Sequence, residues 1–256
     1  MARWQQEMIV FPLFAMLLLS ACAPTQKATP PKDKQKAIAA RNLGEAYLKE
    51  ERYTAALGEF YKAEKLTPDD PMLHNDLGLV YMAKEKTDLA EVHFKKAINL
   101  KPDYSLAKNN LATAYLVKEQ WDKAIPLLEE VTKDMLYATP HFPLANLGWA
   151  YYNKENYTKA AKYFQEALEM VPTFFVARLN LGRTYLATGR LHEALAAFEL
   201  AAQGDPKNPA LLLELGRTYR LLGDYNNAKL ALKGAMELAE DSKLAIEASE
   251  ELRKIY

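Results

Sequence analysis

One motif recurs along this 256-residue chain at an almost constant interval. The pattern is Leu-(Gly/Ala)-x-x-Tyr, and its second positions follow one another at steps of 34, 34, 36, 34 and 34 residues. The six copies begin at Leu43, Leu77, Leu111, Leu147, Leu181 and Leu215. Repetition at this period indicates stacked supersecondary units, each of which packs only against its neighbours. The sequence therefore predicts an elongated repeat architecture over most of the chain.

A second set of residues follows each motif at fixed spacing. An alanine lies twelve residues after the Gly or Ala, and a large apolar residue lies four residues further on. The alanines are Ala56, Ala90, Ala124, Ala160, Ala194 and Ala228, and the large residues are Phe60, Phe94, Leu128, Phe164, Phe198 and Leu232. Both sets fall on one face of an α-helix. Each unit is therefore predicted to be two antiparallel helices that approach closely at the small residues.

This two-helix unit resembles the tetratricopeptide repeat over residues 37–240. The resemblance implies an all-α fold, a right-handed superhelical solenoid of six repeats with a concave groove. The expected repeats are residues 37–70, 71–104, 105–140, 141–174, 175–208 and 209–240. The third repeat departs from the pattern at Ala112 and by a two-residue insertion near residues 133–143. Residues 241–256 carry an apolar stripe (Leu244, Ala248, Leu252 and Ile255) and are expected to form a capping helix.

The N-terminus has the features of an export signal. A single basic residue, Arg3, precedes an eleven-residue apolar run, Ile9 to Leu19, which is too short to cross a bilayer. The run ends in Leu-Ser-Ala-Cys, which resembles the bacterial lipobox. The resemblance implies removal of residues 1–21, lipidation of Cys22 and, because Ala23 follows, location in the outer membrane at its periplasmic face. Residues 22–36, rich in proline and charge, are expected to be a flexible tether. The alternatives to a lipoprotein signal are an ordinary signal peptide with a chance cysteine and a short membrane anchor.

Composition and motifs argue against several classes of function. The 33 basic and 33 acidic residues leave no net charge, which argues against nucleic-acid binding. The single cysteine excludes an intrachain disulfide. The four histidines (His74, His93, His141 and His192) are dispersed and form no metal-binding motif, and no phosphate loop or nucleophile motif is present. We therefore expect a non-catalytic binding protein without a metal or cofactor, while a site assembled across repeats stays an alternative.

The resemblance also places a binding surface on the first helix of each repeat, through unit positions 2, 5, 9, 12 and 13. Its middle is apolar and aromatic, which suits a partner helix or hydrophobic strand, and its C-terminal end is basic. Packing between repeats is the alternative role for any one of these side chains. The candidate groove residues are Met72, Asn75, Leu79, Met82, Leu106, Asn109, Leu116, Phe142, Trp149, Tyr152, Arg183, Arg217 and Arg220.

An export signal with six repeats and a lengthened third repeat resembles the pilotin-type lipoproteins of type IV pili, the PilF/PilW family. The stretch from Leu127 to Tyr137 (LLEEVTKDMLY) is the more specific part of the match. The resemblance implies a lipid-anchored scaffold that binds the outer-membrane secretin and promotes its targeting and multimerisation. A scaffold for peptidoglycan synthesis or outer-membrane protein insertion, or a lipid-anchored enzyme, would share the other features.

Overall fold

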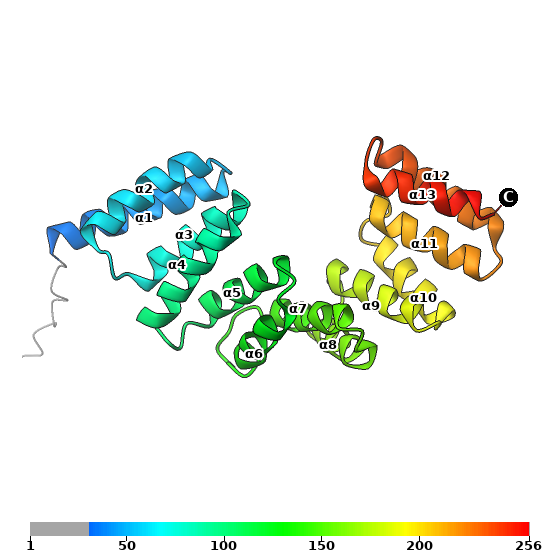
Figure 1. Ribbon diagram of the computed structural model, residues 1–256, viewed down its shortest axis with the longest axis horizontal. Coiled ribbons are helices and arrows are strands. Elements are labelled where there is room, and N and C mark those ends of the chain that lie inside the picture. The colour runs from blue at the N-terminus through cyan, green and yellow to red at the C-terminus, as the bar shows by residue number, and fades with distance from the viewer. Residues whose placement is uncertain (1–30, 256) are drawn as a thin grey trace, which may run out of the picture.

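The computed structural model describes residues 31–255, and all regular secondary structure in that range is α-helical (Figure 1). The helices are α1 (Lys32–Lys49), α2 (Tyr53–Leu66), α3 (Pro71–Ala83), α4 (Thr87–Leu100), α5 (Ser105–Val117), α6 (Trp121–Val131), α7 (His141–Asn153), α8 (Tyr157–Met170), α9 (Phe175–Ala187), α10 (Leu191–Ala202), α11 (Pro209–Leu221), α12 (Tyr225–Leu238) and α13 (Lys243–Arg253). Helices α1 to α12 form six consecutive hairpins, and α13 packs on α11 and α12. The predicted all-α solenoid with a final helix is confirmed.

The hairpins follow one another along an arc with its two ends on the same side (Figure 1). Each odd-numbered helix contacts the next odd-numbered helix, from α1·α3 through to α11·α13. Among residues 31–255 the backbones of the even-numbered helices make no such close approach to one another. Because helices on the inside of a curve crowd together, the odd-numbered helices line the concave side of the solenoid and the even-numbered helices form its convex side.

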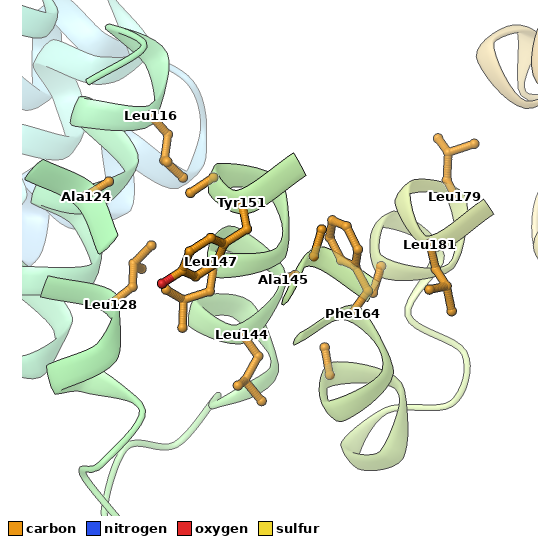
Figure 2. Close-up of a cluster of buried hydrophobic side chains, with 14 of the residues drawn as sticks. Leu116, Ala124, Leu128, Leu144, Ala145, Leu147, Tyr151, Phe164, Leu179 and Leu181 are labelled. Carbon is orange, nitrogen blue, oxygen red and sulfur yellow. The ribbon is translucent and has the colours of Figure 1, made fainter. Parts of the chain in front are cut away.

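Close packing inside five of the six hairpins depends on the motif glycine. A Cβ added at Gly148 in α7 would lie 2.6 Å from Cε1 of Phe164 in α8. Phe164 is fully buried, and in Figure 2 its ring lies between α7 and α9. The third repeat has Ala112 and the smaller Leu128 at the equivalent positions, and both are fully buried. The sequence-based expectation of close approach is therefore correct, and a phenylalanine ring occupies the space in four of the repeats.

The turn inside each repeat has the same backbone geometry. The motif tyrosine carbonyl accepts a hydrogen bond from the amide five residues later, as from Asn156 to Tyr151 at 2.9 Å. The residue before that amide has a positive φ, for example 59° at Glu155 and 72° at Gly189. This arrangement is a Schellman-type helix end, which satisfies carbonyl groups at the C-terminus of the first helix.

Buried apolar side chains form three clusters along the solenoid. The first joins α1, α2 and α3; the second extends from α4 to α12; and the third joins α11, α12 and α13. The boundary between the first and second clusters falls inside the second repeat. Fully buried His74 lies at this boundary, so the core there is partly polar.

The N-terminal predictions are covered only in part by the described residues. The proposed signal peptide, Cys22 and most of the proposed tether lie outside residues 31–255. Helix α1 begins at Lys32, so residues 32–36 are helical and the expected tether end at residue 36 is wrong. The run of Lys, Asp and Gln there continues the first helix without breaking it. Between residues 31 and 255, no helix combines the length and apolar character that a membrane span requires.

Candidate protein-binding groove

Two adjoining cavities lie on the concave side between α7, α9 and α11. One, of about 380 Å³, is bounded by Phe142, Phe174 and Val176, and the other, of about 360 Å³, by Tyr152 and Leu186. Trp149 and Arg183 line both cavities. The two cavities therefore form one surface, with Trp149 at its middle.

The indole of Trp149 is stacked on the phenol of Tyr152. Their ring centroids are 5.6 Å apart and their planes differ by 8°. Burial raises the pKa of the Tyr152 hydroxyl above its usual value, and the nearby Glu214 carboxylate acts in the same direction. Trp149 and Tyr152 are half-buried, so both rings retain exposed surface. A flat, partly exposed aromatic pair of this kind is a common anchor for an apolar side chain of a partner.

The first cavity has a second aromatic wall. Phe142 and Phe174 meet edge to face with centroids 5.4 Å apart, and His141 lies 5.0 Å from Phe174 in the same manner. Phe142 is 46% exposed, which is unusual for a side chain of its size. The aromatic surface therefore extends beyond the turn between α8 and α9, in agreement with the predicted apolar middle of the groove.

The C-terminal end of the groove carries ion pairs in place of the free positive charge that its arginines suggested. Arg183 Nε donates to Glu214 Oε1 at 2.9 Å, and one Arg217 nitrogen lies 3.6 Å from the same oxygen. Arg217 also donates to Glu247, and Arg220 to Glu251 at 3.0 Å. Burial alone would raise the pKa of Glu251, but hydrogen bonding to Lys254 and the charge of Arg220 outweigh it and lower that pKa. The basic groups are thus largely neutralised.

The N-terminal part of the groove is less aromatic. Met72 and Leu106, at the starts of α3 and α5, are 47% and 42% exposed. Leu79 and Met82 are half-buried on α3. Arg41, at the first repeat, is held by Asp70 and Glu45, both at 3.1 Å. This basic residue is therefore engaged within the fold and does not form a free anion clamp.

Three of the predicted groove residues are buried, so their predicted place on the groove surface is wrong. Asn75 is 1% exposed, and Asn109 and Leu116 are each 8% exposed. Asn75 accepts a hydrogen bond from Asn110 at 2.8 Å, which joins α3 to α5. These side chains pack between successive odd-numbered helices, because the inner curve brings those helices together.

Sequence reasoning missed four residues of the cavity walls: Asn146, Phe174, Asn180 and Glu214. Three of them share the sixth position of their repeat, which is polar in every repeat from the second to the sixth. The full set at that position is Asp76, Asn110, Asn146, Asn180 and Glu214. In two repeats this residue bonds the ninth position of the preceding repeat: Asn146 donates to Thr113, and Glu214 accepts from Arg183. A polar residue recurring every repeat was the signal that could have revealed them.

Comparison with known families settles the nature of the repeats. Three tetratricopeptide-repeat sequence models match residues 44–85, 81–135 with 189–248, and 145–209. Together these matches span both ends of the helical array. The chain is a tetratricopeptide-repeat protein.

Solved structures of other tetratricopeptide-repeat proteins have the same fold. A structure from the functional characterisation of Pseudomonas aeruginosa PilF matches with a TM-score of 0.77 and 21% identity, over 88% of this chain and 100% of that one. PilW, described as a widely conserved type IV pilus biogenesis factor, matches with a TM-score of 0.77 and 20% identity, over 86% and 98%. YrrB, described as having an unusual peptide-binding site, has a TM-score of 0.56 at 23% identity, over 75% and 97%.

One curated relative is an enzyme, but only a short segment is shared. Protein O-mannosyl-transferase TMTC3 of Mus musculus is 43% identical over 56 residues, which are 22% of this chain and 6% of that protein. The chain therefore matches a small part of that relative's length. Tetratricopeptide-repeat proteins are typically protein-interaction scaffolds, and this fold fits a non-enzymatic role.

The lengthened third repeat displays two apolar side chains. In the loop between α6 and α7, Met135 is 96% exposed and Leu136 is 94% exposed. The loop is fixed by Asp134, which accepts hydrogen bonds from Ser105 Oγ at 2.5 Å and from the Leu136 amide at 2.9 Å. These two hydrogen bonds lower the pKa of Asp134 below its usual value. The insertion is therefore an ordered loop with an exposed apolar tip.

Proposed function

We propose that this tetratricopeptide-repeat protein is a lipid-anchored scaffold that binds an apolar segment of an outer-membrane secretin and promotes its targeting and multimerisation. The observation that carries the proposal is the continuous aromatic surface on either side of Trp149, on the concave face of the solenoid. A half-buried aromatic cluster without a free charge suits an amphipathic helix or hydrophobic strand.

Two further observations support a pilus-assembly role. The fold extends over the whole of the PilF structure and nearly all of PilW, the latter described as a pilus biogenesis factor. The lengthened third repeat, with Met135 and Leu136 at its tip, offers a second apolar contact outside the groove. Lipidation of Cys22 would confine the scaffold to the inner leaflet of the outer membrane and raise the effective concentration of a captured subunit there.

A gene deletion complemented with variants tests the proposal. We expect deletion to reduce secretin multimer in purified outer membranes, wild type to restore it, and Trp149→Ala to restore it poorly. Cys22→Ser should give a protein that binds the secretin but does not bring it to the outer membrane. Normal amounts of multimer in the deletion strain would overturn the proposal. Co-purification of peptidoglycan synthases or of the outer-membrane insertion machinery in place of secretin would assign the scaffold to another envelope machine.

A further inference from the structure

The second repeat brings together two histidines that the sequence places 19 residues apart. His74 in α3 and His93 in α4 have their Nδ1 atoms 3.1 Å apart. The Glu64 carboxylate, in α2 of the first repeat, lies 4.0 Å from His74 Nδ1. One ligand atom from each of the three residues fits within a span of 4.8 Å. The apparent dispersal of these histidines along the chain was therefore misleading, because both belong to one helix pair.

The hydrogen bonds of His74 leave a lone pair on its Nδ1 atom, which can bind a cation. Its Nε2 lies 2.8 Å from the carbonyl oxygen of Pro68. A carbonyl oxygen only accepts, so Nε2 carries the proton and Nδ1 of the neutral ring is a bare lone pair. Donation of the outer ring N–H to a backbone carbonyl is the arrangement that orients histidine ligands in metal sites. His74 is fully buried, and its ring orientation is therefore fixed by the fold.

We infer that Glu64, His74 and His93 bind a Zn²⁺ ion, with water as the fourth ligand. Two nitrogen ligands of a tetrahedral zinc ion with bonds of 2.0–2.1 Å lie about 3.3 Å apart, close to the separation of the two Nδ1 atoms. Imidazole and carboxylate are both ligands that zinc accepts, and two histidines with one glutamate form a known zinc ligand set.

Zinc entry requires two small movements. In the metal-free pair, His93 Nδ1–H donates to His74 Nδ1. When zinc binds, the His93 proton moves from Nδ1 to Nε2, which leaves a neutral ring with a lone pair on Nδ1 and releases no net proton. The His93 ring must tilt so that both lone pairs point toward Glu64, and the glutamate must approach by roughly 1 Å. Glu64 is partly exposed, with 30% of its side chain accessible, and can move. His93 is half-buried and stacked on Tyr81, with ring centroids 5.3 Å apart, so it can tilt while keeping this contact.

The position of the site indicates what bound zinc would do. Glu64 belongs to the first repeat and both histidines belong to the second, at the boundary between the first and second apolar clusters. Zinc would therefore join the two N-terminal repeats at the boundary between these two clusters. Because the ligands lie on α2, α3 and α4, the site is separate from the aromatic groove between α7 and α11.

The test is a zinc titration of untagged protein that begins at residue 23, which contains every described helix and excludes the Cys22 thiol. After treatment with a chelator, calorimetry should give one Zn²⁺ per chain with micromolar or tighter affinity, and no binding of Mg²⁺. Saturating zinc should raise the Tm by about 5 °C or more. Co²⁺ should give visible absorption bands of tetrahedral coordination.

Variants separate the proposed site from adventitious binding. His93→Gln and Glu64→Gln should each weaken zinc binding at least tenfold, whereas the matched control His192→Gln, at an exposed histidine of α10, should bind like wild type. Circular dichroism of metal-free His93→Gln verifies its fold, and Glu64→Gln changes only a partly exposed side chain. Absence of one-to-one binding to wild type would overturn the inference, as would unchanged affinity in either variant.

Discussion

Gly148 faces Phe164 so closely that a Cβ on the glycine would lie 2.6 Å from the ring. We expect Gly148→Ala to lower the free energy of unfolding by about 1–3 kcal/mol, because a buried ring between two helices cannot move aside freely. Adding Phe164→Leu should recover part of the loss, since the third repeat pairs Ala112 with Leu128. Chemical denaturation of both single variants and the double variant measures the coupling; strict additivity would contradict this account.

Removal of the aromatic pair should weaken partner binding without affecting the fold. Trp149→Ala or Tyr152→Ala should each cost about 2 kcal/mol or more of binding free energy if the pair is a buried anchor in the complex. Tyr225→Ala, at a 52% exposed tyrosine on α12, is the matched control. Affinity for purified secretin subunits and helical circular dichroism are the measurements. Loss of helical signal in the two groove variants would show that they are structural.

Salt should have little effect on that affinity. Arg183 and Arg217 are already paired with Glu214 and Glu247, and an apolar contact is not screened by ions. We expect less than a threefold change in Kd between 50 and 300 mM NaCl, which is about 0.6 kcal/mol. A steep decrease in affinity with rising NaCl concentration would instead show that unpaired charged side chains make the contact.

The C-terminal cap should weaken in acid. The folded-state pKa of Glu251 is lowered, so its stabilising contribution is present above its unfolded pKa and is lost as pH falls through the folded pKa. Glu251→Gln should therefore destabilise the protein at pH 7, by about 1–2 kcal/mol, and this difference should diminish as the pH falls through the folded-state pKa of Glu251. Denaturation of the variant and the wild type across this pH range tests the sign; Glu250→Gln, at the exposed neighbouring position, is the control.

The left-handed backbone at the repeat turns predicts opposite changes in stability for two substitutions. Glu155 has φ of 59° and Gly189 has φ of 72° at the equivalent position of the next repeat. Glu155→Gly should raise stability by about 0.5–1 kcal/mol, and Gly189→Ala should lower it by a similar amount, because side chains disfavour this conformation. Melting temperatures of the two variants should move in opposite directions.

The exposed loop tip should matter for function and not for stability. Met135 and Leu136 are almost fully exposed, so replacing both with serine removes no packing. We expect an unchanged Tm together with reduced secretin multimer in the complemented deletion strain. Val92→Ser, at a 61% exposed residue on α4, is the control for the loss of an exposed apolar side chain outside the loop.

The repeat pattern predicted the fold because its residues make contacts within one helix pair. The sequence separation between Gly148 and Phe164 already predicts the helix pair in which they pack against each other. Trp149 and Tyr152 line one cavity, at the unit positions predicted from the sequence, and their role in binding stays a prediction. Contacts within one helix pair can therefore be predicted from the spacing of residues in a single repeat.

Contacts between repeats were harder to predict. Asn75 and Asn109 were placed on the groove surface, but the curvature of the solenoid buries them between neighbouring helices. The pairing of Arg183 with Glu214 spans 31 residues and depends on the rotation from one repeat to the next. Likewise, the approach of Glu64 to the histidine pair depends on how the first two hairpins are docked, which no spacing rule specifies.

The contact pattern of the solenoid also has a mechanical consequence. Since each repeat touches only the next along the chain, small rotations at successive junctions accumulate from one end of the arc to the other. The curvature of the solenoid can then increase or decrease while every local core stays intact. A ligand bound across α7, α9 and α11 would fix the rotations between these helices. Its binding would therefore change the distance between the two ends of the molecule.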